Sequence, residues 1–296
     1  MQSVMNRRAL VVAVFVLTAS HVWAAQKYDV RGLVLKVDSP RKTMLVSCES
    51  IPGYMEAMTM PFTVREPRML EGLQPGTAVE FTLVVEEDSS YADNVRARAF
   101  ENLELDPTQA RRMKLLEKMV VPSSSLPTAL SIGQPVPDFT LTDQNRQQVR
   151  LSQFAGKVVA VTFVYTRCPF PNYCFRLSNN FGQLQKRFKG QMGRDLVLLT
   201  IVIDPANDRP EALTNYARIW KADSEGWRFL TGTLPEIQQI ARKFDMNFYP
   251  DEALLVHSFH TAVIDRQDRL AANLEGNDFS AQQLGDFVET LLNHSK

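Results

Sequence analysis

The chain has 296 residues, a length typical of two domains, with 45% hydrophobic and 22% charged residues, the balance of an ordinary globular protein. Thirty-three basic residues balance 33 acidic residues, so the formal net charge is zero. This balance excludes a protein that binds nucleic acid or anionic lipid through its overall charge.

The first 24 residues have the pattern of a secretory signal peptide. Arg7 and Arg8 form a basic start, 9–19 is an apolar stretch too short to span a bilayer, and Ala24 ends a small-residue cleavage site. The alternative is an uncleaved N-terminal anchor. We expect an exported, periplasmic protein with no membrane span in its mature chain. Disulfides persist in such a compartment, so one of the three cysteines must be free, intermolecular or metal-bound.

Residues 26–105 are predicted to form a small all-β domain. Alternating apolar residues and Gly, Pro and Asp turn signals predict strands at 30–37, 44–47, 60–64, 78–85 and 95–103. About five strands in fewer than 80 residues are typical of an OB-like barrel.

Soft metal donors gather in this first domain. Met58 and Met60 alternate along a strand, so both thioethers leave it on one face, and Cys48 and Met55 precede them. Thioethers and a thiolate together select Cu(I) over zinc or magnesium. The alternative is that the methionines only fill gaps in the core.

The stretch that contains Cys48, Ile51 and Met58-Thr-Met-Pro-Phe62 is similar to the periplasmic CusF-like copper-binding domains. Cys48 stands where that family has a histidine, and Met55 stands where it has an aromatic cap. The resemblance implies a Cu(I) site made by Cys48, Met55, Met58 and Met60.

Residues 106–131 are predicted to join two domains. Asp106 as N-cap and Pro107 at the first helical position predict a helix to about Met119. The Pro- and Ser-rich stretch that follows has linker composition, which places the domain boundary at about residue 125.

Residues 132–296 alternate strands with helices in the order of a thioredoxin-like α/β domain. We expect buried strands at 158–165 and 196–203, helices at 175–188, 210–221, 234–244 and 280–292, and a hairpin of 259–265 with 269–274. The first strand-to-helix turn of this order carries two of the three cysteines.

Cys168 and Cys174 lie in that turn. A helix N-terminus and the neighbouring Arg167 favour a thiolate at Cys168, and a thiolate is both the nucleophilic and the metal-binding form. From spacing alone the pair could be a structural disulfide, a redox couple or a soft-metal site.

Three separated motifs resemble the Sco/SenC family: Thr166-Arg-Cys-Pro169 after a strand, Ile203-Asp-Pro-Ala-Asn-Asp-Arg-Pro210, and Val256-His-Ser258 followed by Val263-Ile-Asp265. The resemblance implies that Cys168, Cys174 and His257 bind one copper ion. We favour His257 over His260, which points to the opposite face of the expected strand. Here five residues separate the cysteines where the family usually has three, and Phe175 replaces the usual proline.

The leading interpretation is a copper metallochaperone that captures Cu(I) on the barrel and passes it to the second domain. The Sco/SenC resemblance implies delivery to a cuproprotein, such as the dinuclear copper site of cytochrome oxidase subunit II.

The alternative is a thiol–disulfide oxidoreductase, in which Cys168 attacks a target disulfide and Cys174 resolves the mixed disulfide. A peroxiredoxin is disfavoured, because Tyr165 and Val161 stand where that class has Thr and Pro.

Overall fold

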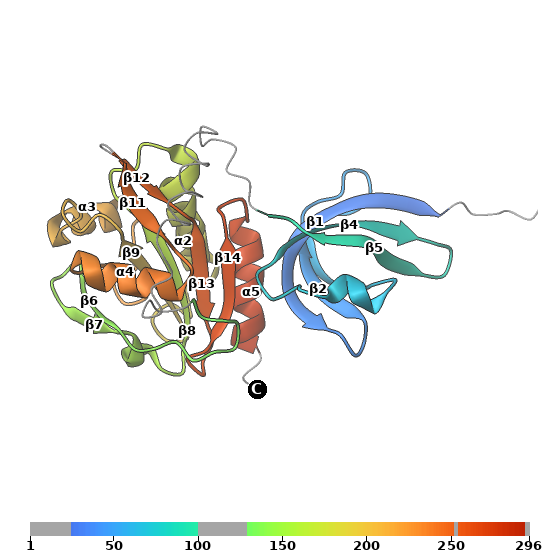
Figure 1. The fold of residues 1–296 in the computed structure, drawn as a ribbon, viewed down its shortest axis with the longest axis horizontal. Coiled ribbons are helices and arrows are strands. Elements are labelled where there is room, and N and C mark those ends of the chain that lie inside the picture. Colours follow the sequence, from blue (N-terminus) through green and yellow to red (C-terminus); the bar gives the residue numbers. More distant parts are fainter. Residues whose placement is uncertain (1–24, 100–128, 252–253, 294–296) are drawn as a thin grey trace, which may run out of the picture.

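A computed structural model describes residues 25–99, 129–251 and 254–293. The predicted signal segment, the helix expected from Asp106, the linker and the boundary near residue 125 lie outside these ranges. Figure 1 shows a small β-domain beside a larger α/β domain, with one helix between them. Within the described ranges, no helix has both the length and the apolar character needed to cross a bilayer.

The first domain is a five-stranded antiparallel barrel of strand order β3-β2-β1-β4-β5. A parallel bridge from Val64 to Ala92 joins the two outer strands. The expected OB-like class is therefore confirmed. The elements are β1 (Gln26–Asp38), β2 (Thr43–Cys48), β3 (Met58–Thr63), the short 3₁₀ helix η1 (Pro67–Leu70), β4 (Ala78–Val85) and β5 (Ser90–Ala97).

The prediction of the last strand at 95–103 was wrong, because β5 begins at Ser90. The Glu86 N–H donates to the Ser89 carbonyl, so a tight hairpin follows β4 directly. Asp93, Asn94 and Arg96 make the start of β5 polar, which hid the strand from a search for alternating apolar residues.

Gly32 allows β1 and β2 to approach closely beside Cys48, its cross-strand partner. A Cβ atom at Gly32 would lie 2.5 Å from Val46 Cγ1 and 2.6 Å from the Ser47 carbonyl oxygen. We therefore expect Gly32→Ala to destabilise the barrel by about 1–3 kcal/mol through overpacking. Hydrogen exchange of the β1 and β2 amides measures this effect. Gly190→Ala is the control, because no atom lies within 4 Å of its added Cβ; equal exchange in the two variants would contradict the prediction.

The second domain is built on a seven-stranded sheet of order β14-β13-β8-β9-β10-β6-β7. The central strands β8, β9 and β10 are parallel, and β8 and β9 are buried along their whole length, as expected for a sheet covered on both faces. The strands are β6 (Thr140–Asp143), β7 (Gln148–Arg150), β8 (Val158–Val164), β9 (Leu196–Val202), β10 (Trp227–Thr231), β13 (His260–Ile264) and β14 (Leu270–Glu275).

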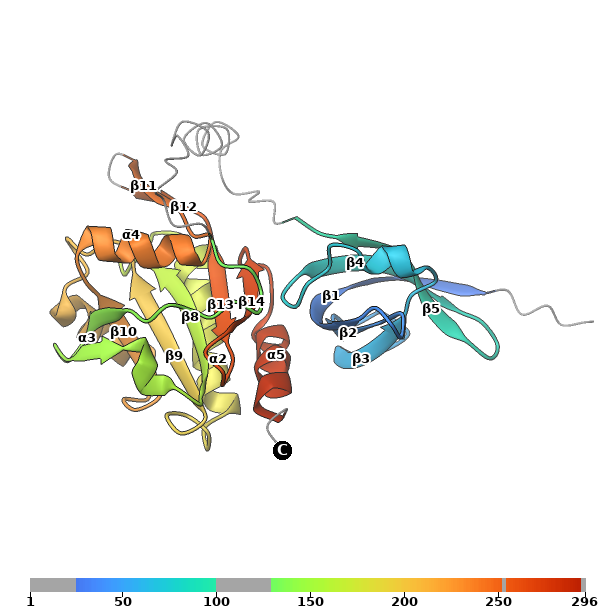
Figure 2. The same cartoon turned by 60° about the horizontal axis from the view of Figure 1, so that its bottom comes forward.

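Helices α2 and α5 pack against each other on one face of this sheet, and α4 covers the other face (Figure 2). Gln283 N–H donates to Ser280 Oγ at 3.1 Å, so Ser280 is the N-cap of α5. The helical elements are η2 (Leu151–Phe154), the π-helical turn η3 (Pro171–Phe175), α2 (Arg176–Arg187), α3 (Pro210–Ile219), α4 (Leu234–Lys243) and α5 (Ala281–Asn293).

The expected thioredoxin-like class is confirmed, with additions that sequence patterns did not indicate. The β6–β7 hairpin and β10 extend one side of the sheet. A separate hairpin of β11 (Phe248–Asp251) and β12 (Leu254–His257) carries His257 outside the main sheet.

The two domains share apolar packing along α5. Leu33 and Leu35 of β1 belong to the same buried cluster as Phe287 of α5. Helix α5 therefore contacts its own sheet on one side and the barrel on the other (Figure 1). The described parts of the two domains are in direct contact along this helix.

Candidate metal sites

The cysteine loop begins where β8 ends, and two aspartates hold it. The Cys168 N–H donates to the Tyr165 carbonyl, which closes a turn. Asp208, which is fully buried, accepts the Thr166 N–H at 3.1 Å and also the Thr166 hydroxyl. Arg167 pairs with Asp204 at 2.8 Å. These contacts fix the backbone just before Cys168.

Asp208 was part of a recognised motif, but its role was not foreseen from the sequence. The Asp204 carboxylate pairs with Arg167, so the cation expected to favour a thiolate is partly neutralised.

The two thiols of the loop are free and differ in character. A hydrogen bond from the Cys174 thiol lowers the pKa of Cys168 to about 6, helped by backbone hydrogen bonds at Phe170 and Cys174, although burial acts in the opposite direction. Burial raises the pKa of Cys174 well above its ordinary value. The pair therefore consists of a Cys168 thiolate that accepts a hydrogen bond from the protonated thiol of Cys174.

Tyr165 is a third member of this site that motif reasoning missed. Burial raises the pKa of its hydroxyl, and a hydrogen bond with Cys168 adds to that rise. Its ring meets the His257 ring edge-on, with centroids 5.8 Å apart. Tyr165 thus contacts both the thiolate and the imidazole.

His257 is held in the tautomer that a metal ligand needs. Its Nδ1 lies 2.8 Å from the Ser258 carbonyl, which can only accept, so Nδ1 carries the proton and Nε2 is free. Burial lowers its pKa to about 4, which leaves the imidazole neutral at pH 7. No pattern in the sequence indicates this carbonyl partner.

The structure brings the two thiols together but does not add the imidazole to them. Among the residues described, no three His, Cys, Asp or Glu side chains converge closely enough to hold a metal ion. His257 packs instead against Phe259, with ring centroids 4.5 Å apart, and against Tyr165. The set Cys168, Cys174 and His257 therefore remains a proposal.

The competing histidine, His260, lies in a different environment. It is buried in β13, and it lines a cavity of about 620 Å³ between the domains together with Asp245, Asn273 and Glu275. Burial lowers its pKa. The cysteine loop does not line this cavity.

In the barrel, strand pairing places the soft donors on one face. Cys48 lies directly opposite Met58 in the β2–β3 ladder, and Val46 lies opposite Met60. Side chains of directly opposed residues share a face, so Cys48, Met58 and Met60 all project to the same side of the β2–β3 pair.

Burial separates these donors into two kinds. Cys48 is buried, and Met55 and Met60 pack partly buried against the same core cluster, so a packing role also fits them. Met58 is 48% exposed, and core packing does not account for it. Burial, followed by the nearby Glu49, raises the pKa of Cys48 to about 12, so this thiol is protonated at neutral pH.

The fold and these two clusters define a class: a thioredoxin-like thiol domain joined to a β-barrel that carries sulfur donors. Residues 131–293 match the family model of SCO1/SenC, and residues 27–92 match the model described as copper binding periplasmic protein CusF. The chain belongs to the SCO1/SenC family and carries a CusF domain.

Relatives with curated descriptions align with part of the chain. A SCO1 protein homolog of Bacillus subtilis is 30% identical over 113 residues, which are 38% of this chain and 57% of that one. A putative copper-binding protein of Stutzerimonas stutzeri is 31% identical over 117 residues, which are 39% of this chain and 54% of that one. The chain thus spans just over half the length of these two relatives.

The fold is similar to that of a crystal structure of Arabidopsis thaliana ScoI with copper bound. The alignment covers 55% of this chain and 99% of that chain, with 22% identity and a TM-score of 0.47.

Proposed function

We propose that this protein is an exported copper metallochaperone with two copper sites. The observation that carries the proposal is the pair of free thiols of Cys168 and Cys174 in mutual contact, in a chain of the SCO1/SenC family. Two thiolates and an imidazole suit copper in either oxidation state.

Cys168 would bind first, because its thiol already tends to be ionised, and Cys174 would release its proton on binding. The free Nε2 of His257 would complete the site after the β11–β12 hairpin moves towards the loop. Tyr165, which touches both Cys168 and His257, would have to shift during that movement.

In the barrel, Cys48, Met55, Met58 and Met60 would hold Cu(I). The match to the CusF model supports this set, and the register supports Cys48, Met58 and Met60 as donors on one face. Exposed Met58 would be the entry point for the ion.

The test is metal analysis of the reduced mature protein. We expect two copper ions per chain in the wild type, one in Cys168→Ala/Cys174→Ala and one in Met58→Ala/Met60→Ala. Loss of both ions in either variant, or no copper in the wild type, would refute two independent sites.

Copper would then pass from the barrel to the cysteine site and on to an acceptor such as cytochrome oxidase subunit II. Ser47 and Thr59 of the barrel contact Asp286 of α5, and the neighbouring sulfur donors project to the opposite face of their strands. Transfer of copper within the chain would therefore require the barrel to leave the helix. X-ray absorption of a chain loaded with one Cu(I) would follow thioether ligands giving way to thiolate ligands. A spectrum that keeps its thioether signal would count against transfer within the chain.

The unequal pKa values of the two thiols also favour a second function, reduction of a disulfide in a target protein. Cys168 Sγ would form a bond with one target sulfur while the target S–S bond breaks, and the other sulfur would leave and take up a proton. Cys174 would then lose its proton, attack Cys168 Sγ and release the second target thiolate. Two electrons and the proton of Cys174 would pass to the target, which would leave as one thiol and one thiolate, and the Cys168–Cys174 disulfide would remain.

Replacing His257 separates the two functions. We expect His257→Ala to weaken copper binding at the cysteine site by roughly ten- to a hundredfold, as loss of a ligand or its support commonly does. Dithiol reactivity should persist. Competition with a Cu(I) chelator and the rate of reduction of a disulfide peptide measure the two effects; unchanged copper affinity would remove His257 from the site.

A further inference from the structure

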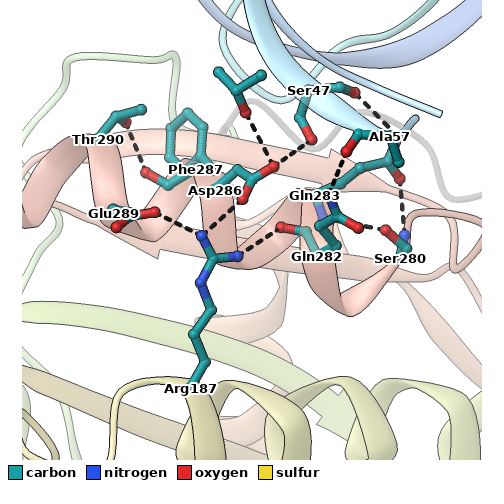
Figure 3. A network of polar contacts seen from close by, with 11 residues as sticks. Ser47, Ala57, Arg187, Ser280, Gln282, Gln283, Asp286, Phe287, Glu289 and Thr290 are labelled. Atoms are coloured by element: carbon teal, nitrogen blue, oxygen red, sulfur yellow. Dashed lines mark hydrogen bonds and ion pairs between the residues drawn. The ribbon is translucent and has the colours of Figure 1, made fainter. Parts of the chain in front are cut away.

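On the polar side of α5, the Asp286 carboxylate contacts the barrel (Figure 3). Asp286 Oδ2 accepts hydrogen bonds from Ser47 Oγ at 2.7 Å and from Thr59 Oγ1 at 3.0 Å. Its other oxygen, Oδ1, pairs with Arg187 of α2 at 2.7 Å. One side chain of the second domain therefore joins β2 to β3 of the first.

Two glutamines of α5 add contacts to the same two strands. Gln282 donates to the Ala57 carbonyl at 3.3 Å, and Gln283 donates to the Ser47 carbonyl at 3.4 Å (Figure 3). The helix thus holds Ser47, Ala57 and Thr59 by hydrogen bonds.

These anchored residues are the chain neighbours of the sulfur donors. Ser47 precedes Cys48, and Ala57 and Thr59 flank Met58. Because successive side chains of a strand point to opposite faces, a helix that binds Ser47 and Thr59 leaves Cys48, Met58 and Met60 on the other face. Helix α5 therefore fixes the backbone of the donors without covering their sulfur atoms.

The donor end of β3 needs such support. Strand β3 pairs with β2 along one edge, whereas among the described residues its backbone pairing with β5 begins only beyond the strand, at Val64 and Arg65. In the described ranges, no ladder pairing holds the outer edge at Met58–Thr63. A strand end paired on one side opens more readily than a central strand.

The anchor is built at some cost to the second domain. The Asp286 side chain is only 10% exposed, and Arg187 supplies the charge that such a carboxylate requires. A Cβ atom at Gly285 would lie 2.5 Å from Arg187 Nη1, so glycine leaves the space that the guanidinium crosses. Glycine is less favourable than alanine inside a helix, because it loses more backbone freedom on folding.

We propose that Asp286 is a positioning residue for the Cu(I) site of the barrel, acting through Ser47 and Thr59. The inference rests on the proposed copper function of Cys48, Met58 and Met60. It adds that the SCO1/SenC domain raises the copper affinity of the neighbouring domain, because docking on α5 holds β2 and β3 at the spacing that the sulfur ligands need.

The experiment uses the full mature chain with Cys168→Ala/Cys174→Ala, so that only the barrel site reports. Cu(I) affinity is measured by competition with a chromogenic chelator, and the thiolate-to-Cu(I) absorption of Cys48 is recorded. We expect Asp286→Ala to weaken binding about tenfold, the usual scale for loss of a group that supports a ligand. Asp286→Asn should restore most of the affinity, because its amide oxygen still accepts from a hydroxyl.

Glu289→Gln is the matched control. Glu289 pairs with the same Arg187 at 2.6 Å but has no hydrogen bond to the barrel among the described contacts. The Cu(I) affinity of the Glu289→Gln variant should therefore stay within twofold of that of the background chain. The pair Ser47→Ala/Thr59→Val should match Asp286→Ala, and combining all three changes should produce no further loss, since they remove one shared interaction.

The outcomes distinguish the two levels of the proposal. If the background chain retains no Cu(I), the proposed copper function of the barrel fails, and the inference fails with it. If the background chain binds Cu(I) but Asp286→Ala binds as tightly as Glu289→Gln, the positioning role is overturned and the copper function stands. Additive losses of Cu(I) affinity in the combined variant would also overturn the positioning role of Asp286.

Discussion

Cys168 will be alkylated with a pH midpoint near 6 in the reduced, metal-free protein, while Cys48 and Cys174 stay unlabelled. The reactive form is the thiolate, and the pKa of Cys168 is lowered from 9.0 to about 6. Lower basicity also reduces intrinsic nucleophilicity, so we expect labelling about 30-fold faster than for an ordinary thiol at pH 5.5 but about tenfold slower at pH 9. Iodoacetamide kinetics measure the pH midpoint and the relative rates, and peptide mapping identifies which cysteine is labelled.

Two substitutions at Cys174 test the cause of this reactivity. The hydrogen bond from Cys174 is the largest contribution to the lowered pKa, so Cys174→Ala should move the midpoint of Cys168 towards 9. Cys174→Ser keeps an O–H donor and should leave the midpoint low. A midpoint near 9 in the wild type, or equal midpoints in the two variants, would contradict this account.

Asp208→Ala will loosen the cysteine loop and destabilise the second domain by about 2–3 kcal/mol, the value of hydrogen bonds to a charged group. The fully buried carboxylate holds both the N–H and the hydroxyl of Thr166, two residues before Cys168. Its loss leaves the Thr166 N–H without that acceptor and frees the turn that sets the spacing of the two sulfur atoms. We therefore also expect the alkylation midpoint of Cys168 to rise. Urea unfolding and the same labelling assay measure the two effects.

Asp138→Ala is a control with the same hydrogen-bond pattern on the surface. Asp138 accepts from the N–H and the hydroxyl of Ser152, both at 2.9 Å, but its side chain is 48% exposed. Water can replace those bonds, so the cost should be at most about 1 kcal/mol, with no change at Cys168. Similar losses of stability in the two variants would show that burial of Asp208 is unimportant.

Both fold classes and both clusters of sulfur residues could be predicted from the sequence. Strands β8 and β9 are continuous apolar runs, and the Cys168–Cys174 and Met58–Met60 spacings lie within single short segments. Such signals are local, because side-chain periodicity depends only on neighbouring residues. Strand β5 was misplaced because its polar residues break that periodicity.

The sequence by itself determined where sulfur and imidazole donors occur and which strands and turns carry them, because those properties depend on residue type and short spacing. Only the tertiary structure decided that Tyr165 meets His257, that Asp208 holds the turn before Cys168, and that Asp286 holds Ser47. Ser47 and Asp286 are 239 positions apart, and no local pattern records a contact between faces that meet only after both domains have folded.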